Sequence, residues 1–223
     1  MRAFEKFLTE SQQRQLLRHM HLRRADALAR RDGALMRLLL HTGMRLGETC
    51  LMTVGCAMEA LKAGWVFIPR EHRKGGKRDH TVRVTEPVRE ALRDLLGARA
   101  EITGQALVRE EAPLLASRQG EGMSARAVQY MVRRRAVEAG LASITPHWLR
   151  HTRAKNIMRR SSSNDPRGLV QAALGHASIS STGIYTEVSA DELAEALEEV
   201  DGLGDRRAVR RGLRRAYEGR ASA

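Results

Sequence analysis

One clear pair of segments in this chain is patterned like β-strands, while most of the remaining sequence is patterned like helices. The segments W-V-F-I-P and T-V-R-V, at 65–69 and 81–84, are rich in β-branched and aromatic residues, as strands are. Between them lies a basic loop, R-E-H-R-K-G-G-K-R-D-H, whose Gly75-Gly76 pair suits the positive φ angles of a turn. The pattern predicts a β-hairpin, or two short strands, with a basic tip.

Helical periodicity accounts for most of the other segments. Apolar residues recur every three or four positions in runs that follow capping residues and stop at glycines. The expected helices are 9–20, 34–41, 46–52, 86–96, 125–139, 146–160, 167–174 and 189–200, with a charged connector at 23–31 and a short strand near Leu114-Leu115. The pattern predicts a mainly α domain with a small antiparallel β-sheet at residues 1–200, followed by a basic C-terminal tail at 201–223.

Three finer expectations come from the same pattern. Gly97 should end the helix that begins at Glu86, because glycine is common just past helix ends. In the helix capped by Ser124, Val137 should face the core with the other apolar residues. The run Arg133, Arg134 and Arg135 in that helix should form a basic surface patch.

Charge limits the kind of partner. The chain has 223 residues, is 42% hydrophobic and carries a net charge of +13 with a pI near 11.0, which favours a polyanion over other partners. No apolar run approaches the roughly 18 residues of a membrane span, and the first residues lack a signal peptide's apolar stretch. Cys50 and Cys56 are too few for a disulfide framework or a zinc site. These features predict a cytoplasmic protein with two reduced cysteines in or near its core and nucleic acid as its partner.

Five residues have the chemistry to hold and attack a phosphodiester. Arg45 follows the break at Thr42-Gly43, His147 and Arg150 share one helix face, and His176 precedes Tyr185 by nine positions. Arginine binds phosphate oxygens with a planar fork that stays protonated. A phenol with a pKa of about 10 is ionised in only about one molecule in a thousand at pH 7, so nearby cations and a histidine base would have to activate it.

Each of these residues also has a plain structural explanation. An arginine after a turn is usually a surface or helix-end cation, a histidine at a helix start usually caps or packs, and most tyrosines are half-buried. The basic hairpin could be a solvated tip. The conjunction of these residues in one basic domain favours the chemical interpretation.

Three motifs carry a family resemblance. The segments T-G-M-R-L-G-E, H-W-L-R-H-T-R-A and L-G-H-A-S-I-S-S-T-G-I-Y-T-E-V, beginning at Thr42, His147 and Leu174, resemble the signature boxes of the tyrosine recombinases, the phage integrase family. The boxes occur in the family's order, and the resemblance runs from about Thr9 to Val200. It implies the catalytic-domain fold of these recombinases.

The resemblance implies a role for each motif residue. Arg45 and Arg150 would clamp the scissile phosphate, and His176 would hydrogen-bond one of its oxygens. His147 would act as general base and acid on the tyrosine proton. Tyr185 would be the nucleophile and would form a 3′-phosphotyrosyl bond, leaving a free 5′-hydroxyl.

The hairpin and the first motif supply supporting roles. By resemblance, Lys74 would protonate the leaving oxygen, with Lys77 as the weaker candidate, and Glu48 would brace Arg45. Basic residues of the hairpin and of the helix after Ser124 are predicted to contact DNA: Arg73, Lys77, Arg78, Arg133 and Arg134. The resemblance implies neither metal nor cofactor, because the arginines and the lysine supply the cations.

Partners follow from the same resemblance. They are double-stranded DNA and further copies of this chain in a homo-oligomer, a tetramer on DNA. The implied location is the nucleoid in the cytoplasm. The chain begins almost where the family's catalytic domain begins, so it resembles the short members that lack the amino-terminal clamp domain; an accessory DNA-binding protein could replace that clamp. The acidic helix at 189–200 could dock on a neighbouring subunit or pack on its own domain.

Two other functions stay open from the sequence. The same chemistry serves type IB topoisomerases, which relax supercoiled DNA, although the third motif resembles the integrases more. A non-catalytic DNA-binding regulator on the same fold is the other alternative. The intact set of candidate catalytic residues counts against it.

Overall fold

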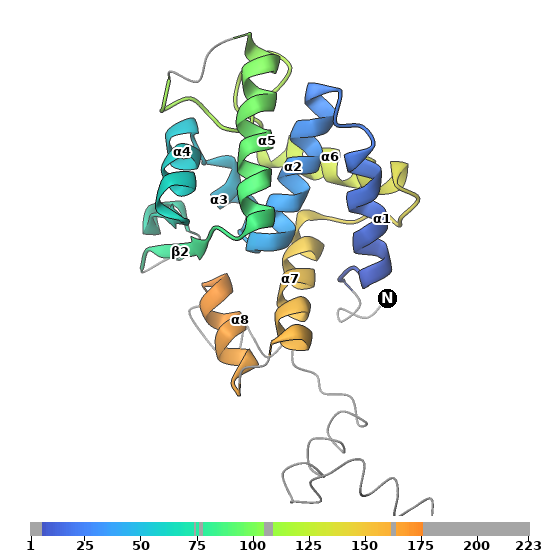
Figure 1. Ribbon diagram of the computed structural model, residues 1–223, viewed down its shortest axis with the longest axis vertical. Helices are drawn as coiled ribbons and strands as arrows, with labels where there is room; N and C mark the ends of the chain where they lie inside the picture. Colours follow the sequence, from blue (N-terminus) through green and yellow to red (C-terminus); the bar gives the residue numbers. More distant parts are fainter. Residues whose placement is uncertain (1–5, 74, 76–77, 105–108, 162–163, 176–223) are drawn as a thin grey trace, which may run out of the picture. The chain divides into compact units, whose positions relative to one another are not determined.

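We describe a computed structural model of the chain at residues 6–73, 75, 78–104, 109–161 and 164–175 (Figure 1). The chain divides into two compact units, Met1–Tyr185 and Thr186–Ala223, and every described residue belongs to the first. The predicted acidic helix at 189–200 and the tail at 201–223 lie outside the described residues, as do Lys74, Lys77, His176 and Tyr185.

The described part of the chain is mainly helical and contains one small sheet, as predicted. Its elements in order are α1 (Glu10–His21), α2 (Ala27–Thr42), α3 (Leu46–Cys50), α4 (Val54–Ala63), β1 (Trp65–Ile68), η2 (Arg70–His72), β2 (His80–Arg83), α5 (Glu86–Thr103), α6 (Ala125–Glu138), α7 (Pro146–Arg160) and α8 (Pro166–Leu174). Within these residues no helix is both long and apolar enough to cross a membrane.

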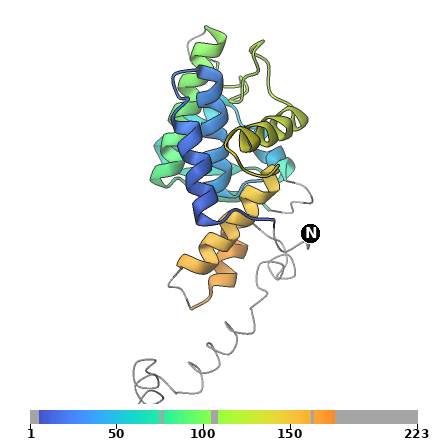
Figure 2. The ribbon, with the colours of Figure 1, turned by 90° about the vertical axis from the view of Figure 1, so that its right-hand side faces the viewer.

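Helix α2 forms the centre of the core. Its side chains Leu35, Leu38 and Leu39 are at most 1% exposed, and α1, α5 and α7 all pack against it. Figures 1 and 2 show α1, α2 and α5 running side by side. Because α2 is buried on most of its circumference, its C-terminal end is held firmly within the domain.

The two-stranded sheet confirms the predicted hairpin. β1 pairs antiparallel with β2 in the register Trp65↔Arg83 to Ile68↔His80. The guanidinium of Arg83 also lies over the Trp65 ring, 4.9 Å from its centroid, which adds a cation–π contact to the strand pairing. In the turn, Gly75 has a φ of 63°, the left-handed conformation for which glycine was predicted.

Several helix boundaries differ from the sequence prediction. Helix α2 begins at Ala27, inside the expected connector, because the Asp26 carboxylate accepts hydrogen bonds from the first-turn amides of Leu28 and Ala29. Helix α5 continues past Gly97 to Thr103, since the buried stripe continues with Ala98 and ends only at Gly104.

The structure differs from the sequence prediction at three further places. Helix α4 was not predicted; Thr53 caps it, and its buried face consists mostly of small residues that give a weak apolar signal. Leu114 and Leu115 are buried but belong to no strand, and their neighbours form only isolated bridges. Val137 is 59% exposed rather than turned inward. Cys50 is partly buried and Cys56 is exposed; both are free thiols.

Candidate functional site

Arg45 lies in the tight turn between α2 and α3, as predicted. Gly43 ends α2 with a φ of 67°, and the chain re-enters a helix directly after Arg45. The Glu48 carboxylate accepts one hydrogen bond from the Arg45 backbone amide, at 2.8 Å, and another from its guanidinium, at 3.0 Å. The Glu48 side chain is only 3% exposed, whereas the Arg45 side chain is 34% exposed. A buried carboxylate therefore holds an arginine that still reaches solvent.

Arg150 joins the ends of two helices. It is 4% exposed on α7, and its guanidinium donates to the carbonyl of Gly43 and, at 3.0 Å, to the carbonyl of Leu174. These carbonyls stand at the C-terminal ends of α2 and α8, where the partial negative charge of a helix favours a cation. Arg150 therefore connects the Arg45 turn to the end of α8.

His147 lies one turn before Arg150 on α7 and keeps contact with solvent. Its ring meets the His151 ring edge to face, with centroids 4.2 Å apart. The pKa of His147 is lowered from its ordinary value of 6.5, first by partial burial and then by the charges of Arg150, Lys6 and Arg45. The neutral imidazole, which is the form able to accept a proton, is therefore favoured near neutral pH.

The predicted DNA contacts of the hairpin divide into two environments. Arg78 is exposed. Arg73 has a side chain only 9% exposed, and its guanidinium donates to the backbone carbonyls of Arg78, at 2.7 Å, and Gly175, at 2.5 Å. Its Nε also lies 3.7 Å from Glu48 Oε1. The Arg73 side chain is therefore directed into the domain.

His80 joins this group and was not singled out from the sequence. Its Nε2 lies 3.3 Å from the Ala173 carbonyl. Its pKa is lowered mainly by burial, then by the Arg73 charge; Arg150 also lowers it, while the Ala173 hydrogen bond and Glu48 raise it. Its position at the turn end of β2, paired with Ile68, gives no sequence signal for a contact with α8.

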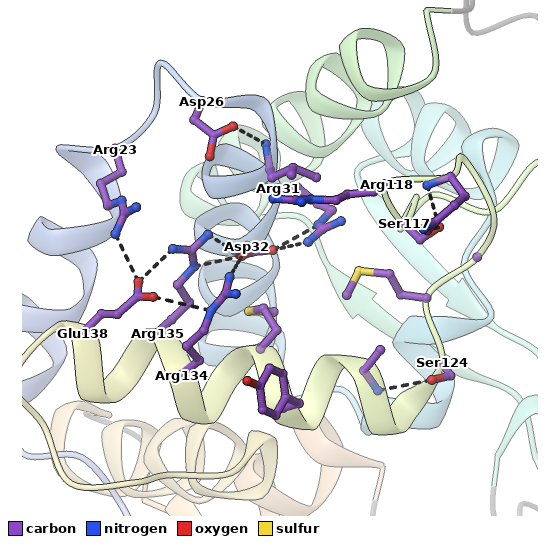
Figure 3. A pocket seen from close by; sticks show the side chains of 17 residues that line it. Arg23, Asp26, Arg31, Asp32, Ser117, Arg118, Ser124, Arg134, Arg135 and Glu138 are labelled. Atoms are coloured by element: carbon purple, nitrogen blue, oxygen red, sulfur yellow. Dashed lines mark hydrogen bonds and ion pairs between the residues drawn. The ribbon is translucent and has the colours of Figure 1, made fainter.

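The arginines of α6 also divide, and one of them corrects the predicted basic patch. Arg133 is exposed, whereas Arg134 is half-exposed and lies 3.4 Å from Glu138. Arg135 is 4% exposed and directed inward, where its guanidinium binds the fully buried Asp32 at 2.8 Å (Figure 3). Four arginines that line the pocket in Figure 3 pair with Asp32 or Glu138 of the same domain: Arg23, Arg31, Arg134 and Arg135.

The structure thus brings Arg45, Glu48, His147 and Arg150 together with Arg73 and His80. The proposed acid Lys74 or Lys77, His176 and the nucleophile Tyr185 lie outside the described residues. In the described part of the chain, no three His, Cys, Asp or Glu side chains are grouped as metal ligands.

Comparison with known proteins assigns this chain to a family. The sequence pattern of the phage integrase family matches residues 6–192. Similar proteins include tyrosine recombinase XerC of Azotobacter vinelandii, 36% identical over 183 residues, and tyrosine recombinase XerA of Pyrococcus furiosus, 31% identical over 173 residues. These matches cover 82% and 78% of this chain and 56% of each relative, so the chain spans little more than half their length.

Solved structures support the same placement at the level of the fold. A crystal structure of XerA recombinase matches with a TM-score of 0.67 at 24% identity, covering 86% of this chain and 62% of that one. The XerH site-specific recombinase bound to difH substrate, in a pre-cleavage complex, matches with a TM-score of 0.66 at 22% identity, covering 88% and 55%. The predicted recombinase catalytic-domain fold is confirmed, and by sequence pattern and relatives together the chain belongs to the phage integrase family, the family of the tyrosine recombinases.

Proposed function

We propose that this chain is the catalytic part of a site-specific DNA recombinase that cleaves and rejoins strands through a 3′-phosphotyrosyl intermediate. The observation that carries the proposal is the joint anchoring of Arg45 and Arg150 at the C-terminal end of α2. Glu48 holds the first guanidinium, and the Gly43 carbonyl holds the second. Two fixed cations with His147 in their field suit a phosphate that gains charge in its transition state.

The proposed reaction balances without an outside reagent. The Tyr185 oxygen attacks phosphorus while its proton passes to His147, and the bond from phosphorus to the 5′ oxygen breaks. Lys74, or alternatively Lys77, gives a proton to that oxygen. The phosphotyrosyl bond keeps the energy of the broken phosphodiester, so the reverse attack by another 5′-hydroxyl rejoins DNA without ATP. Arginine and lysine charges take the place that metal ions have in other phosphoryl transfers.

The proposed partner is double-stranded DNA, at the nucleoid in the cytoplasm. The net charge of +13 supports it. The relative solved with a bound difH substrate is a recombinase of the same fold, which supports the same partner here. A homo-oligomer on DNA, with an accessory protein in place of a clamp domain, belongs to the same proposal.

A nicked suicide duplex carrying the recombination site tests the chemistry. The nick makes the released fragment, which carries the free 5′-hydroxyl, short enough to diffuse away. Rejoining is then impossible, so we expect the protein to remain covalently bound to DNA on a denaturing gel. Tyr185→Phe should abolish the adduct while leaving DNA affinity intact. An adduct formed by Tyr185→Phe would contradict the assignment of the nucleophile.

The same preparation separates the alternatives. Relaxation of any supercoiled plasmid by a monomer would indicate a type IB topoisomerase. DNA binding without cleavage on any substrate, and unchanged by alanine at the candidate catalytic residues, would indicate a regulator.

A further inference from the structure

We propose that Arg73 is a positioning residue, which ties the β1–β2 turn and the C-terminal end of α8 to the carboxylate that holds Arg45. This inference deepens the proposed function and rests on it for its chemical consequence. The tie itself consists of described residues and is testable without DNA.

The contacts of Arg73 reach three separate parts of the domain. One terminal nitrogen donates to the Arg78 carbonyl, 2.7 Å away across the turn, and the other donates to the Gly175 carbonyl, 2.5 Å away beyond α8. Its Nε approaches Glu48 Oε1, at 3.7 Å. These acceptors come from segments separated by more than a hundred positions in the chain, from Glu48 to Gly175. A guanidinium can reach all three because its donors diverge in one plane, which an ammonium cannot do.

The packing around Gly175 shows how close this contact is. Gly175 has a φ of 62°, and a Cβ there would collide with the Arg73 guanidinium and lie 3.0 Å from the His80 ring. His80 in turn lies 3.3 Å from the Ala173 carbonyl. The hairpin and the end of α8 are therefore joined by two side chains, Arg73 and His80, at a point where only glycine leaves room.

Burial separates this role from a direct DNA contact. The Arg73 side chain is 9% exposed, and both of its terminal nitrogens donate to backbone carbonyls. Arg70, in the same turn, is exposed. Of these two arginines, Arg70 is the one whose side chain is open to a DNA phosphate.

The chemical consequence follows from the sequence neighbours of the tied residues. Lys74, the proposed acid, comes directly after Arg73, and His176 comes directly after Gly175. A single guanidinium therefore joins the residue after α8 that precedes His176, and the turn residue that precedes Lys74, to the carboxylate that holds Arg45. Loss of the tie should affect protonation of the leaving oxygen more than DNA binding.

Hydrogen exchange of the DNA-free protein tests the tie. In Arg73→Ala and Arg73→Lys we expect faster exchange in peptides covering both 69–80 and 166–175. Arg70→Ala removes the same charge from the same turn, and hydrogen exchange at 166–175 should be unchanged in this control. Unchanged exchange at 166–175 in both Arg73 variants would overturn the tie.

A sulfur-substituted DNA tests the chemical consequence. A duplex with sulfur at the bridging 5′ position of the scissile phosphate leaves as a thiolate, which needs no proton because thiols are far more acidic than alcohols. At saturating DNA, both Arg73 variants should form the adduct at least about tenfold more slowly than the wild type on the oxygen substrate. Complete loss of a general acid slows a reaction by roughly 100- to 10,000-fold, which sets the upper limit of the effect. On the sulfur substrate, most of this deficit should disappear.

Each outcome has a distinct meaning. Equal slowing on both substrates would overturn the link to the acid. Normal rates with Arg73→Lys would indicate that charge alone matters, which contradicts the proposal. A wild-type protein that forms no adduct on either substrate would count against the proposed function instead, and hydrogen exchange would still decide the tie.

Discussion

At the scale of single residues, the candidate site depends on arginines that bind backbone carbonyls at the C-terminal ends of helices. Arg150 donates to Gly43 and Leu174, and Arg73 donates to Gly175. Each acceptor stands where a helix dipole is negative, so the cation is stabilised before any phosphate arrives. Such preorganisation reduces the rearrangement needed when a substrate binds.

The electrostatic field of these arginines predicts the pH dependence of cleavage. If His147 accepts the tyrosine proton, its neutral form is the active one, and activity is lost as pH falls through its pKa. Because that pKa is lowered by burial and then by Arg150, Lys6 and Arg45, kcat/KM for adduct formation should stay level down to a pH below 6.5. Lys6→Gln removes one of the cations and should move the inflection upward. A wild-type inflection at or above pH 6.5 would contradict this assignment.

At the scale of elements, the sequence predicted segments better than it predicted where they end. Thr9, Ser124 and Gly175 mark boundaries that the structure confirms, because caps and left-handed glycines act locally. Gly97 failed as a stop, since continued burial of α5 outweighs the roughly 1 kcal/mol cost of one glycine in a helix. Helix α4 was missed because its buried face is mostly alanine and valine.

The packing of α6 on α2 depends on a buried carboxylate that sequence patterning did not identify. Asp32 is 0% exposed and binds the guanidinium groups of Arg31, at 2.6 Å, and Arg135, at 2.8 Å. Asp32→Asn removes the negative charge and leaves two buried cations with a weaker acceptor. We expect the free energy of unfolding, measured by urea titration, to fall by about 3–5 kcal/mol.

A second acid of the same cluster provides the matched control. Glu138 binds Arg135 at 2.8 Å but is 30% exposed, so water can replace it. Glu138→Gln should therefore cost less than about 1 kcal/mol. Equal losses in the two variants would mean that burial does not set the strength of this cluster.

At the scale of the whole molecule, the site is assembled from segments that the sequence keeps far apart. Arg45, His147 and Arg150 could be proposed from their types and spacing, and Glu48 from the family resemblance. The structure places these four residues near one another. The contacts of Arg73 and His80 with α8 could not be predicted, because they depend on how the hairpin lies against a helix about a hundred residues later. Periodicity reports the buried face of each element and not its partner.

The junction of α2 and α7 predicts how the stability of the whole domain depends on pH. Burial, and then the charges of Arg153, Arg37 and Arg160, lowers the pKa of His41 from 6.5 to about 4. Between these values the unfolded chain binds a proton that the folded chain does not, so stability is lost as pH falls from about 6.5 toward 4. The loss is at most about 1.4 kcal/mol per pH unit, and less because the ring is only partly buried.

His41→Gln isolates this contribution, since glutamine stays uncharged over the whole range. We expect the drop in free energy of unfolding between pH 7 and pH 5, measured by urea titration, to be smaller in the variant than in the wild type. Other groups titrate equally in both proteins and cancel in the comparison. If both proteins lost the same stability over this range, His41 would have to be protonated in the folded domain, and its surroundings could not be the cationic ones that α7 provides.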